Sequence, residues 1–388
     1  MNFVFLSPHF PPNYFQFAFW LRELGVSVFG LADEPYDLLS NELKKCLREY
    51  YKVHDMHNYD QLVRALGYFT HRYGKLDRLE SFNEYWLETE AHLRTDFNLA
   101  GLNSIDIMKV KRKSLMKQIF QKAGVLAARG KICHTISDAY KLIDETGYPI
   151  VAKPDIGVGA AKTYKIHNST ELEQFFAQKP SVDYILEEFI QGAIFTFDGL
   201  VDQDGNLAFY TSHTYSQGIM EVVNNDDNVF YYSLRKIPED LEDAGRRILK
   251  AYGLRERFFH FEFFRRDTDH ALVALEVNMR PPGGLTTDMF NYANDMDIYK
   301  EWAYIVVHNK FTADYTRPYH SCYVSRKSNR NYAHSHDEIV SALGPGSLSH
   351  HQPISGVFSA ALGDYGYLVR SPDLDEINSM IEFIQQLR

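Results

Sequence analysis

The chain has 388 residues, and 41 lysines and arginines against 51 aspartates and glutamates give it a formal net charge of −10. Hydrophobic residues make up 45% and charged residues 24%, which is typical of a globular protein and excludes a disordered or collagen-like chain. The acidic balance argues against a general nucleic-acid or anionic-membrane surface, because either needs a basic face. We therefore expect no nucleic-acid and no membrane partner, and two or three domains at this length.

The cysteines and the first residues indicate where the protein resides. Cys46, Cys133 and Cys322 are odd in number and far apart, which fits neither a disulfide framework nor a closely spaced cysteine metal site. Residues 1–21 are apolar but lack a basic start and are interrupted by prolines, so we expect no signal peptide. No apolar run approaches the roughly 20 residues that span a bilayer. These features predict a cytoplasmic protein with free thiols.

Residues 1–104 alternate short apolar runs with helical patterns, which is typical of a parallel α/β layer. Residues 3–6 predict a first strand, residues 14–24 a helix, and residues 26–29 a second strand. The loop at residues 7–12 lacks Gly-x-Gly-x-x-Gly, the sequence that cradles the pyrophosphate of dinucleotides. We therefore interpret this layer as a scaffold or as a substrate-side layer.

The rest of the chain predicts mixed helices and strands, so the fold class is α/β with α+β character after the first layer. Residues 109–124 form a basic helix whose apolar stripe leaves the lysines at its start and on its outer face. Residues 148–153 predict a strand that runs into a turn of small residues. Two further strands follow at residues 258–265 and 271–277.

The strongest chemical signal lies on the last two of these strands. Alternate side chains of a strand share a face, so Glu276, Asn278 and Arg280 point the same way. The turn between the strands brings Glu262 roughly opposite Glu276. Two carboxylates and an amide oxygen on one face are costly without a cation, and Mg²⁺ prefers such ligands. The pattern indicates a site for Mg²⁺, or for Mn²⁺, with Arg280 in reach of a phosphoryl group.

The same alternation turns Leu275 and Val277 into a core. The alternative to a metal site is a solvated strand face with ion pairs to Arg265 or Arg266. The ordered set of oxygens, followed by Pro-Pro-Gly-Gly, favours the metal.

A second, cationic signal comes earlier in the chain. Lys153 ends an apolar strand, where its charge would be poorly solvated without an anion. The following segment, Gly157-Val-Gly159-Ala160-Ala, is small enough for backbone N–H groups to approach phosphate oxygens. Lys113 is a weaker candidate, because a lysine-rich helix start is usually a solvated face.

A third signal is Leu186-Glu187-Glu188-Phe189-Ile190, an apolar strand end that passes into an acidic pair. Its backbone could offer a carbonyl and an N–H group to an adenine edge. A surface strand end is the alternative interpretation.

Taken in order, these segments resemble the ATP-grasp superfamily, in particular carboxylate–amine ligases like those within carbamoyl-phosphate synthase large chains and biotin carboxylases. The resemblance covers residues 105–285, and Glu276-x-Asn278-x-Arg280 is its most specific piece. It implies a nucleotide held between two α+β subdomains. The implied parts are an N-terminal Rossmann-like domain at 1–104, a lid subdomain at 105–190, a catalytic subdomain at 191–316 and a C-terminal α+β extension at 317–388.

The resemblance also implies roles for single residues. Lys113 and Lys153 would hold the nucleotide phosphates, and the loop with Gly157, Gly159 and Ala160 would close over them. Adenine would be bound by Glu187 and by the backbone of Glu188 and Ile190. The magnesium ligands would be Glu262, Glu276 and Asn278, and Arg280 would steady the transferred phosphoryl group.

One position departs from the family pattern. The family commonly has a glutamate for the ribose hydroxyls where this chain has Ile194, which cannot accept those hydrogen bonds. Either Asp198 or another carboxylate serves instead, or the ribose contacts are looser than usual.

The resemblance implies that ATP and Mg²⁺ activate a small-molecule carboxylate as an acyl phosphate, which an amine then attacks. A phosphotransferase on the same scaffold, or a nucleotide-binding protein without ligase activity, is the alternative. A homodimer is a further possibility. Four cationic side chains outside these segments are candidates for holding a substrate carboxylate, namely Arg94, Arg326, Lys327 and Arg330. The favoured interpretation of each one is a surface charge.

Overall fold

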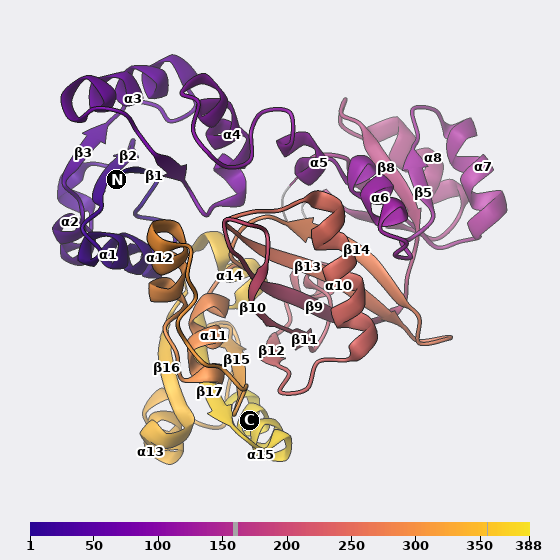
Figure 1. The fold of residues 1–388 in the computed structure, drawn as a ribbon. Coiled ribbons are helices and arrows are strands. Elements are labelled where there is room, and N and C mark those ends of the chain that lie inside the picture. Colours follow the sequence, from indigo (N-terminus) through magenta and orange to yellow (C-terminus); the bar gives the residue numbers. More distant parts are fainter. Residues whose placement is uncertain (158–161, 355) are drawn as a thin grey trace.

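The computed structural model describes residues 1–157, 162–354 and 356–388. Gly159 and Ala160, two of the predicted phosphate contacts, lie outside these described residues. The described helices and strands form three sheets, which follow one another along the chain (Figure 1). The predicted α/β fold class is confirmed, with one parallel sheet and two sheets built largely or wholly of antiparallel pairs.

The first sheet is parallel and has the strand order β3-β2-β1-β4. Phe3 and Phe5 of β1 pack on one face of it, and Val4 and Leu6 pack on the other. Because helices cover both faces, the strand is apolar at almost every position. The elements of this part are β1 (Asn2–Leu6), α1 (Phe15–Glu23), β2 (Ser27–Ala32), α2 (Asn41–Cys46), β3 (Glu49–Lys52), α3 (Tyr59–Tyr73), β4 (Arg78–Glu80), the short 3-10 helix η3 (Glu84–Trp86) and α4 (Leu87–Asp96).

The second sheet is antiparallel and has the order β5-β8-β6-β7. Ile150 and Ala152 of β6 face a core that α7 and α8 cover. The alternation of a strand turns Val151 and Lys153 to the opposite face, where both line a cavity. The elements are α5 (Ile107–Lys111), α6 (Lys113–Lys122), β5 (Gly130–Ile132), α7 (Ile136–Thr146), β6 (Ile150–Pro154), β7 (Tyr164–Ile166), α8 (Ser169–Gln178) and β8 (Tyr184–Glu188).

The third sheet has nine strands, in the order β14-β13-β9-β11-β12-β15-β17-β16, with β10 paired to β9. It runs from residue 192 to residue 371, so the C-terminal strands continue the sheet that carries the acidic residues. Its strands are β9 (Gly192–Val201), β10 (Leu207–Thr211), β11 (His213–Tyr215), β12 (Phe230–Ser233), β13 (Arg257–Arg266), β14 (Leu272–Asn278), β15 (His320–Arg326), β16 (Leu348–Pro353) and β17 (Tyr365–Ser371).

Seven helices accompany the third sheet in the described part of the chain. In Figure 1, α14 lies near the middle of the molecule, between the first sheet and the strands of the third. The helices are α9 (Ile219–Asn225), α10 (Glu239–Tyr252), α11 (Thr286–Asn294), α12 (Ile298–His308), α13 (His336–Ser347), α14 (Gly356–Leu362) and α15 (Leu374–Gln385).

A cluster of aromatic rings joins the first sheet to the third. Phe17 of α1 stacks on Phe82 at 4.2 Å between ring centroids, and both meet Trp302 of α12 edge-on at 5.0 Å. Phe258 of β13 belongs to the same buried cluster. Large buried rings contribute several kcal/mol each, so this contact fixes the parallel layer against the strands that carry the acidic residues.

A buried ionic network makes a second connection between these parts. Arg94 of α4 lies 2.8 Å from Glu80 and 3.1 Å from Glu90, and Arg257 of β13 binds both carboxylates. Arg257 also donates to the backbone carbonyl of Met279, the residue before Arg280, at 2.6 Å. Burial works to raise the pKa of Glu90, but the two guanidinium groups hold it below its ordinary value.

The structure corrects the interpretation of Arg94 and its companions as surface charges. Arg94 is completely buried in the network just described, and Arg326 donates to the carbonyls of Ile384 and His334. Lys327 is buried beside Asp226, and Arg330 pairs with Asp227. These side chains stabilise the fold, and none of them lines the cavity described below.

All three cysteines are free, as the sequence predicts, and all three are buried. In the part of the chain that the structure describes, no helix combines the length and the apolar character needed to cross a membrane.

Candidate active site

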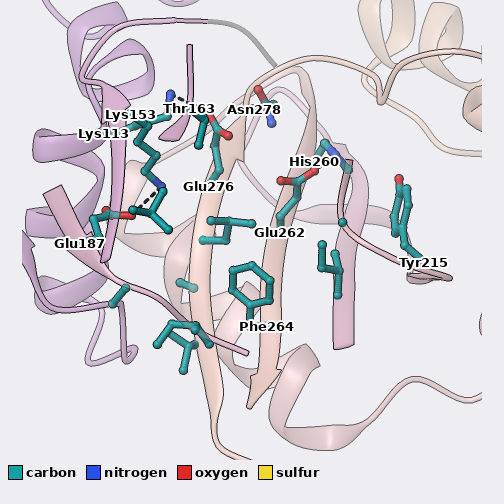
Figure 2. A pocket seen from close by; sticks show the side chains of 18 of the residues that line it. Lys113, Lys153, Thr163, Glu187, Tyr215, His260, Glu262, Phe264, Glu276 and Asn278 are labelled. Atoms are coloured by element: carbon teal, nitrogen blue, oxygen red, sulfur yellow. Dashed lines mark hydrogen bonds and ion pairs between the residues drawn. The ribbon is translucent and has the colours of Figure 1, made fainter. Parts of the chain in front are cut away.

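A cavity of about 570 Å³ lies between the second and the third sheet, within the usual size of small-molecule sites. Side chains from β6 and β8 line one wall, and side chains from β13 and β14 line the other (Figure 2). The described residues of every predicted group line it, namely Lys113, Lys153, Gly157, Glu187, Glu188, Ile190, Glu262, Glu276, Asn278 and Arg280.

The two carboxylates lie on neighbouring strands. Glu262 of β13 pairs directly with Glu276 of β14, and His260 pairs with Asn278, so the predicted register is confirmed. Figure 2 shows all four side chains on the same side of the two strands. A rigid antiparallel hairpin therefore presents two carboxylates and one amide oxygen to the cavity.

Leu275 does not point into the core, as strict alternation would require. A β-bulge shifts the register after Glu262, so that Phe263 pairs with Ala274 and Leu275 is left as the extra residue. A bulge breaks the period of two, and Leu275 therefore lines the cavity next to Glu276. Val277 does enter the core, as predicted.

The cationic wall is built around Glu187. Its carboxylate lies 2.7 Å from the ammonium of Lys153 on β6 and 2.6 Å from that of Lys117 on α6. Burial works to lower the pKa of Lys153, but Glu187 raises it above its ordinary value. Burial likewise works to raise the pKa of Glu187, and the two lysines bring it below its ordinary value. Glu187 thus favours the charged form of Lys153, whereas burial lowers the pKa of Lys117 in spite of the same carboxylate.

Lys113 connects the two walls. It begins α6, and its ammonium lies 3.2 Å from a carboxylate oxygen of Glu276 and 3.4 Å from the backbone oxygen of Gly157. Its side chain is only 8% exposed. A lysine so placed lies between the acidic hairpin and the segment of small residues, where an anion held by the hairpin could also reach it.

A relay of hydrogen bonds runs from the buried His213 and Asp198 to Glu262. Asp198 of β9 lies 2.8 Å from Nδ1 of His213 and 2.6 Å from Nδ1 of His260, and Nε2 of His260 lies 3.1 Å from Glu262. Burial works against both charges, yet the pairing lowers the pKa of Asp198 to about 2 and raises that of His260 to about 9. The imidazolium thus fixes one oxygen of Glu262.

This relay settles one question that the sequence leaves open. Asp198 is completely buried, and its oxygens are taken by Thr196, His213 and His260. It therefore cannot serve ribose hydroxyls in place of the missing glutamate at Ile194. Ile194 itself lines the cavity.

Arg280 lies just beyond the hairpin, at the side of the first sheet. Its guanidinium donates to the carboxylate of Glu84 at 3.2 Å, to the carbonyl of Pro281 at 2.9 Å and to Oδ1 of Asn278 at 3.5 Å. Glu84 also lies 3.3 Å from Lys111. The N-terminal part of the chain, which forms the first sheet, thus contributes the acidic side chain of Glu84 in η3 to the cavity.

The strand end around Glu188 forms the opposite end of the cavity. The backbone N–H group and the guanidinium group of Arg129 donate hydrogen bonds of 2.7–2.9 Å to the Glu188 carboxylate. Ile190 is buried and lines the cavity together with Val151 and Phe264. This end can cover the faces of a flat ring system.

The donor set fits a nucleotide phosphate group bound with a divalent cation. The oxygens of Glu262, Glu276 and Asn278 are the hard ligands that Mg²⁺ prefers, and Mg²⁺ commonly takes only a few of them together with substrate phosphates. Lys113 pairs with Glu276, and Lys153 lies on the wall that faces the two strands (Figure 2). A polyanion can therefore be held between lysine ammonium groups and the carboxylate and amide oxygens of the hairpin.

Residues 146–288 match the ATP-grasp domain family. This span includes Lys153, Glu187, Glu262, Glu276 and Asn278, whereas Lys113 lies before it. Residues 146–288 thus resemble an ATP-grasp domain.

The arginine-specific L-amino acid ligase of Bacillus subtilis is 23% identical to this chain over 220 residues, covering 54% of this chain and 53% of that enzyme. The chain thus spans about half the length of this relative. It spans less than a fifth of the carbamoyl phosphate synthase large chains that it also resembles.

Two solved structures share the fold over at least 98% of this chain. The L-amino acid ligase of Bacillus licheniformis superposes with a TM-score of 0.77 at 15% identity, covering 100% of this chain and 97% of its own. The biotin carboxylase domain of the Hydrogenobacter thermophilus 2-oxoglutarate carboxylase, solved with MgADP, ADP and bicarbonate, gives 0.71 at 16% identity, covering 98% and 89%. The predicted resemblance to ATP-grasp proteins is thus confirmed.

Two side chains of the cavity, Lys117 and Glu84, escaped sequence reasoning, and Asp198 was considered only as a ribose ligand. Lys117 faces Glu187 rather than solvent, and its spacing of four residues from Lys113 was the available signal, because such residues share a helix face. Glu84 and Asp198 gave no local signal. They reach the site only through packing of the first sheet and through pairing of β9 with β13.

Proposed function

We propose that this protein is an ATP-dependent ligase that joins a small-molecule carboxylate to an amine and releases ADP and phosphate. The observation that carries the proposal is the convergence, in one cavity, of Lys113 and Lys153, the side-chain oxygens of Glu262, Glu276 and Asn278, and Arg280. The similarity to amino acid ligases supports it.

Each group has a proposed role in holding ATP. Lys113 and Lys153 hold the phosphates, with Glu187 and Lys117 fixing the position of Lys153. Adenine lies at the end of the cavity lined by Ile190, with Glu187 and the backbone of Glu188 beside it. Glu262, Glu276 and Asn278 would hold Mg²⁺, or Mn²⁺ in its place. When bound, the metal neutralises charge on the phosphates and polarises the transferred phosphoryl group.

The chain's own residues then support two chemical steps. In the first, a substrate carboxylate oxygen attacks the γ-phosphorus of ATP, and the bond between that phosphorus and the bridging β-phosphate oxygen breaks. ADP departs, and the substrate becomes an acyl phosphate. Arg280, with its forked donors, neutralises the charge that develops on the transferred group. In the second, an amine attacks the carbonyl carbon of the acyl phosphate. The bond from that carbon to the phosphate oxygen breaks, and phosphate leaves with the bonding electrons. Removal of the amine proton completes the amide.

The cavity must exclude water, because water would hydrolyse an acyl phosphate. The predicted closing loop includes Gly157, whose carbonyl oxygen already lies beside Lys113. The remaining residues of that loop lie outside the described part of the chain. We also propose that the protein is located in the cytoplasm and acts on substrates there. Light scattering would test the homodimer that the sequence left open.

Pairs of carboxylates and amines, screened for ADP release with mass detection of the product, test this proposal. A ligase requires both partners and forms an amide. A phosphotransferase would instead retain phosphate on the acceptor, and a binding protein would release no ADP above the protein-free rate.

A productive pair allows a sharper test with ¹⁸O in the substrate carboxylate. Attack of that carboxylate on ATP transfers one ¹⁸O atom into the released phosphate. Unlabelled phosphate, formed together with amide, would exclude the acyl phosphate route.

A further inference from the structure

The cavity has two apolar ends, separated by the charged groups in its middle. The first end is lined by Val151, Ile190 and Phe264 and suits the adenine ring of the proposed nucleotide. The second end lies beyond His260. Figure 2 shows Tyr215 there, on the far side of Glu262 from Lys113 and Lys153. The second end, which we call the acceptor end, is lined by Tyr215, Tyr231, Thr286, Phe358, Ala361 and Leu362.

Stacked tyrosine rings form one wall of the acceptor end. Tyr215 stacks on Tyr231 at 4.7 Å, and Tyr231 stacks on Tyr323 at 5.1 Å. The hydroxyl of Tyr231 is bound to Oγ1 of Thr286 at 2.9 Å, and that of Tyr323 donates to the carbonyl of Leu362 at 2.6 Å. Because the Tyr231 hydroxyl is bound within the protein, Tyr231 offers the cavity its ring rather than a free hydroxyl group.

The other wall of the acceptor end comes from helix α14, in the C-terminal part of the chain. Phe358, Ala361 and Leu362 line the cavity from this helix and belong to, or pack against, one hydrophobic cluster with Tyr215 and Tyr231. Phe358 stacks on Phe10 of the loop after β1, with 5.2 Å between ring centroids and an angle of 15°. The first sheet and the C-terminal segment therefore build this end together.

The acceptor end is joined directly to the segment that carries Arg280. Oγ1 of Thr286, the partner of the Tyr231 hydroxyl, donates to the carbonyl of Gly283 at 2.8 Å. A molecule whose body rests on the tyrosine wall therefore has its near end beside Arg280 and Glu262. That is where an acid group must lie to attack the phosphoryl group.

We propose that the acceptor end binds the uncharged, apolar side chain of the substrate acid, so that the preferred substrates are amino acids or related acids with aromatic or branched aliphatic side chains. This inference rests on the proposed function and adds the substrate class to it. Burying such a side chain against rings is favourable, whereas a guanidinium or carboxylate would lose its hydration there. The preference would differ from that in the name of the arginine-specific relative.

Two variants at the acceptor end and one at the adenine end test the inference. Ala361→Leu fills the acceptor end, and Leu362→Ala enlarges it. Ile190→Ala is the matched control, a buried aliphatic residue of the same cavity at its other end. The acids compared are L-phenylalanine, L-leucine, L-alanine, L-arginine and L-glutamate, each with the same amine.

For the wild-type protein, L-phenylalanine or L-leucine should give the highest kcat/KM. Ala361→Leu should lower kcat/KM for L-phenylalanine by about tenfold or more relative to L-alanine, as expected for a changed apolar pocket. Leu362→Ala should raise kcat/KM for L-phenylalanine, the larger acid, relative to kcat/KM for L-leucine. Ile190→Ala should raise the KM for ATP without changing the ranking of the acids.

A preference for L-arginine or L-glutamate, or a ranking that neither acceptor-end variant changes, would overturn the inference while leaving ligase activity in place. If no acid supports ADP release, the proposed function fails instead. Calorimetric titration of L-phenylalanine and L-arginine into the MgADP-loaded protein then still decides the inference. Binding of L-phenylalanine that Ala361→Leu abolishes supports it, and tighter binding of L-arginine or no binding of L-phenylalanine refutes it.

Discussion

Glu262 and Glu276 lie directly opposite each other on the antiparallel strands β13 and β14, and both face the cavity. Two carboxylates so close would raise each other's proton affinity without neighbouring cations. Lys113 contacts Glu276 and His260 contacts Glu262, so each carboxylate has one cationic partner in the protein. This arrangement leaves oxygen lone pairs that a divalent cation can use.

Glu276→Gln should abolish most of the turnover while leaving the fold intact. The amide keeps the shape but removes the charge that binds the cation, so kcat should fall by at least about 100-fold, as when a preorganised charge-stabilising group is removed. Steady-state ADP release and circular dichroism measure the two effects. Asp269→Asn is the control, because Asp269 is an exposed carboxylate in the turn of the same hairpin that pairs with Arg266. Wild-type rates in Glu276→Gln would refute the metal assignment.

Arg280→Lys should be almost as inactive as Arg280→Ala. A lysine restores the charge but not the fork of donors that engages two oxygens of a phosphoryl group. We expect kcat to fall by about 100-fold or more in both variants, with a small change in the KM for ATP. Arg265→Ala, on the outer part of β13, should retain normal kcat, because Arg265 pairs with Asp240 outside the cavity. A full rescue by lysine would show that charge alone suffices.

Lys153→Met and Glu187→Gln should differ in their effects on stability. Lys153→Met leaves Glu187 paired with Lys117, whereas Glu187→Gln leaves two buried ammonium groups without their carboxylate. Losing the shared partner should cost about 3–5 kcal/mol of unfolding free energy, and losing one of the two lysines should cost less.

Urea unfolding measures this difference, and ATP titration measures the other expected effect. Lys153→Met should weaken ATP binding by about tenfold or more, through the loss of a charged contact to phosphate. Equal stability of the two variants would contradict the role given to Glu187, and an unchanged ATP affinity would contradict the role given to Lys153.

Asp198→Asn should make the protein less stable at neutral pH and less sensitive to acid. In the folded protein the pKa of Asp198 is about 2, against an ordinary value of 3.8. A lowered pKa adds stability that is fully present above pH 3.8 and is lost as the pH falls through 2. For this buried group the contribution is about 2 kcal/mol, which the variant lacks.

Unfolding free energies measured from neutral pH downwards test this prediction. The difference between the wild-type protein and Asp198→Asn should shrink as the pH falls below about 4. Asp269→Asn should change little at any pH, because that surface charge is screened by solvent. A difference that stays constant with pH would show that Asp198 contributes by shape alone.

The sequence predicted those features that depend on local pattern. The strand β1, the helix α1, the hairpin register and the grouping of the Glu262, Glu276 and Asn278 oxygens follow from periodicity and from residue spacing. Leu275 was misplaced because a one-residue bulge leaves no mark in an apolar run. Lys117 was misplaced because its partner Glu187 comes from a strand 70 residues away.

Other features depend on pairings that the sequence does not encode locally. Asp198 reaches His260 only because β9 lies beside β13, and Arg94 is buried only because Glu80, Glu90 and Arg257 converge on it. The acceptor end requires α14, β12 and the loop after β1 to meet. Such sites are products of tertiary packing.

A crystal structure of the protein with MgADP tests the central claim most directly. We predict metal density within bonding distance of oxygens of Glu262, Glu276 and Asn278, and the ADP phosphates beside Lys113 and Lys153. A nucleotide bound elsewhere, or phosphates beside the lysines with no cation on those three residues, would contradict it.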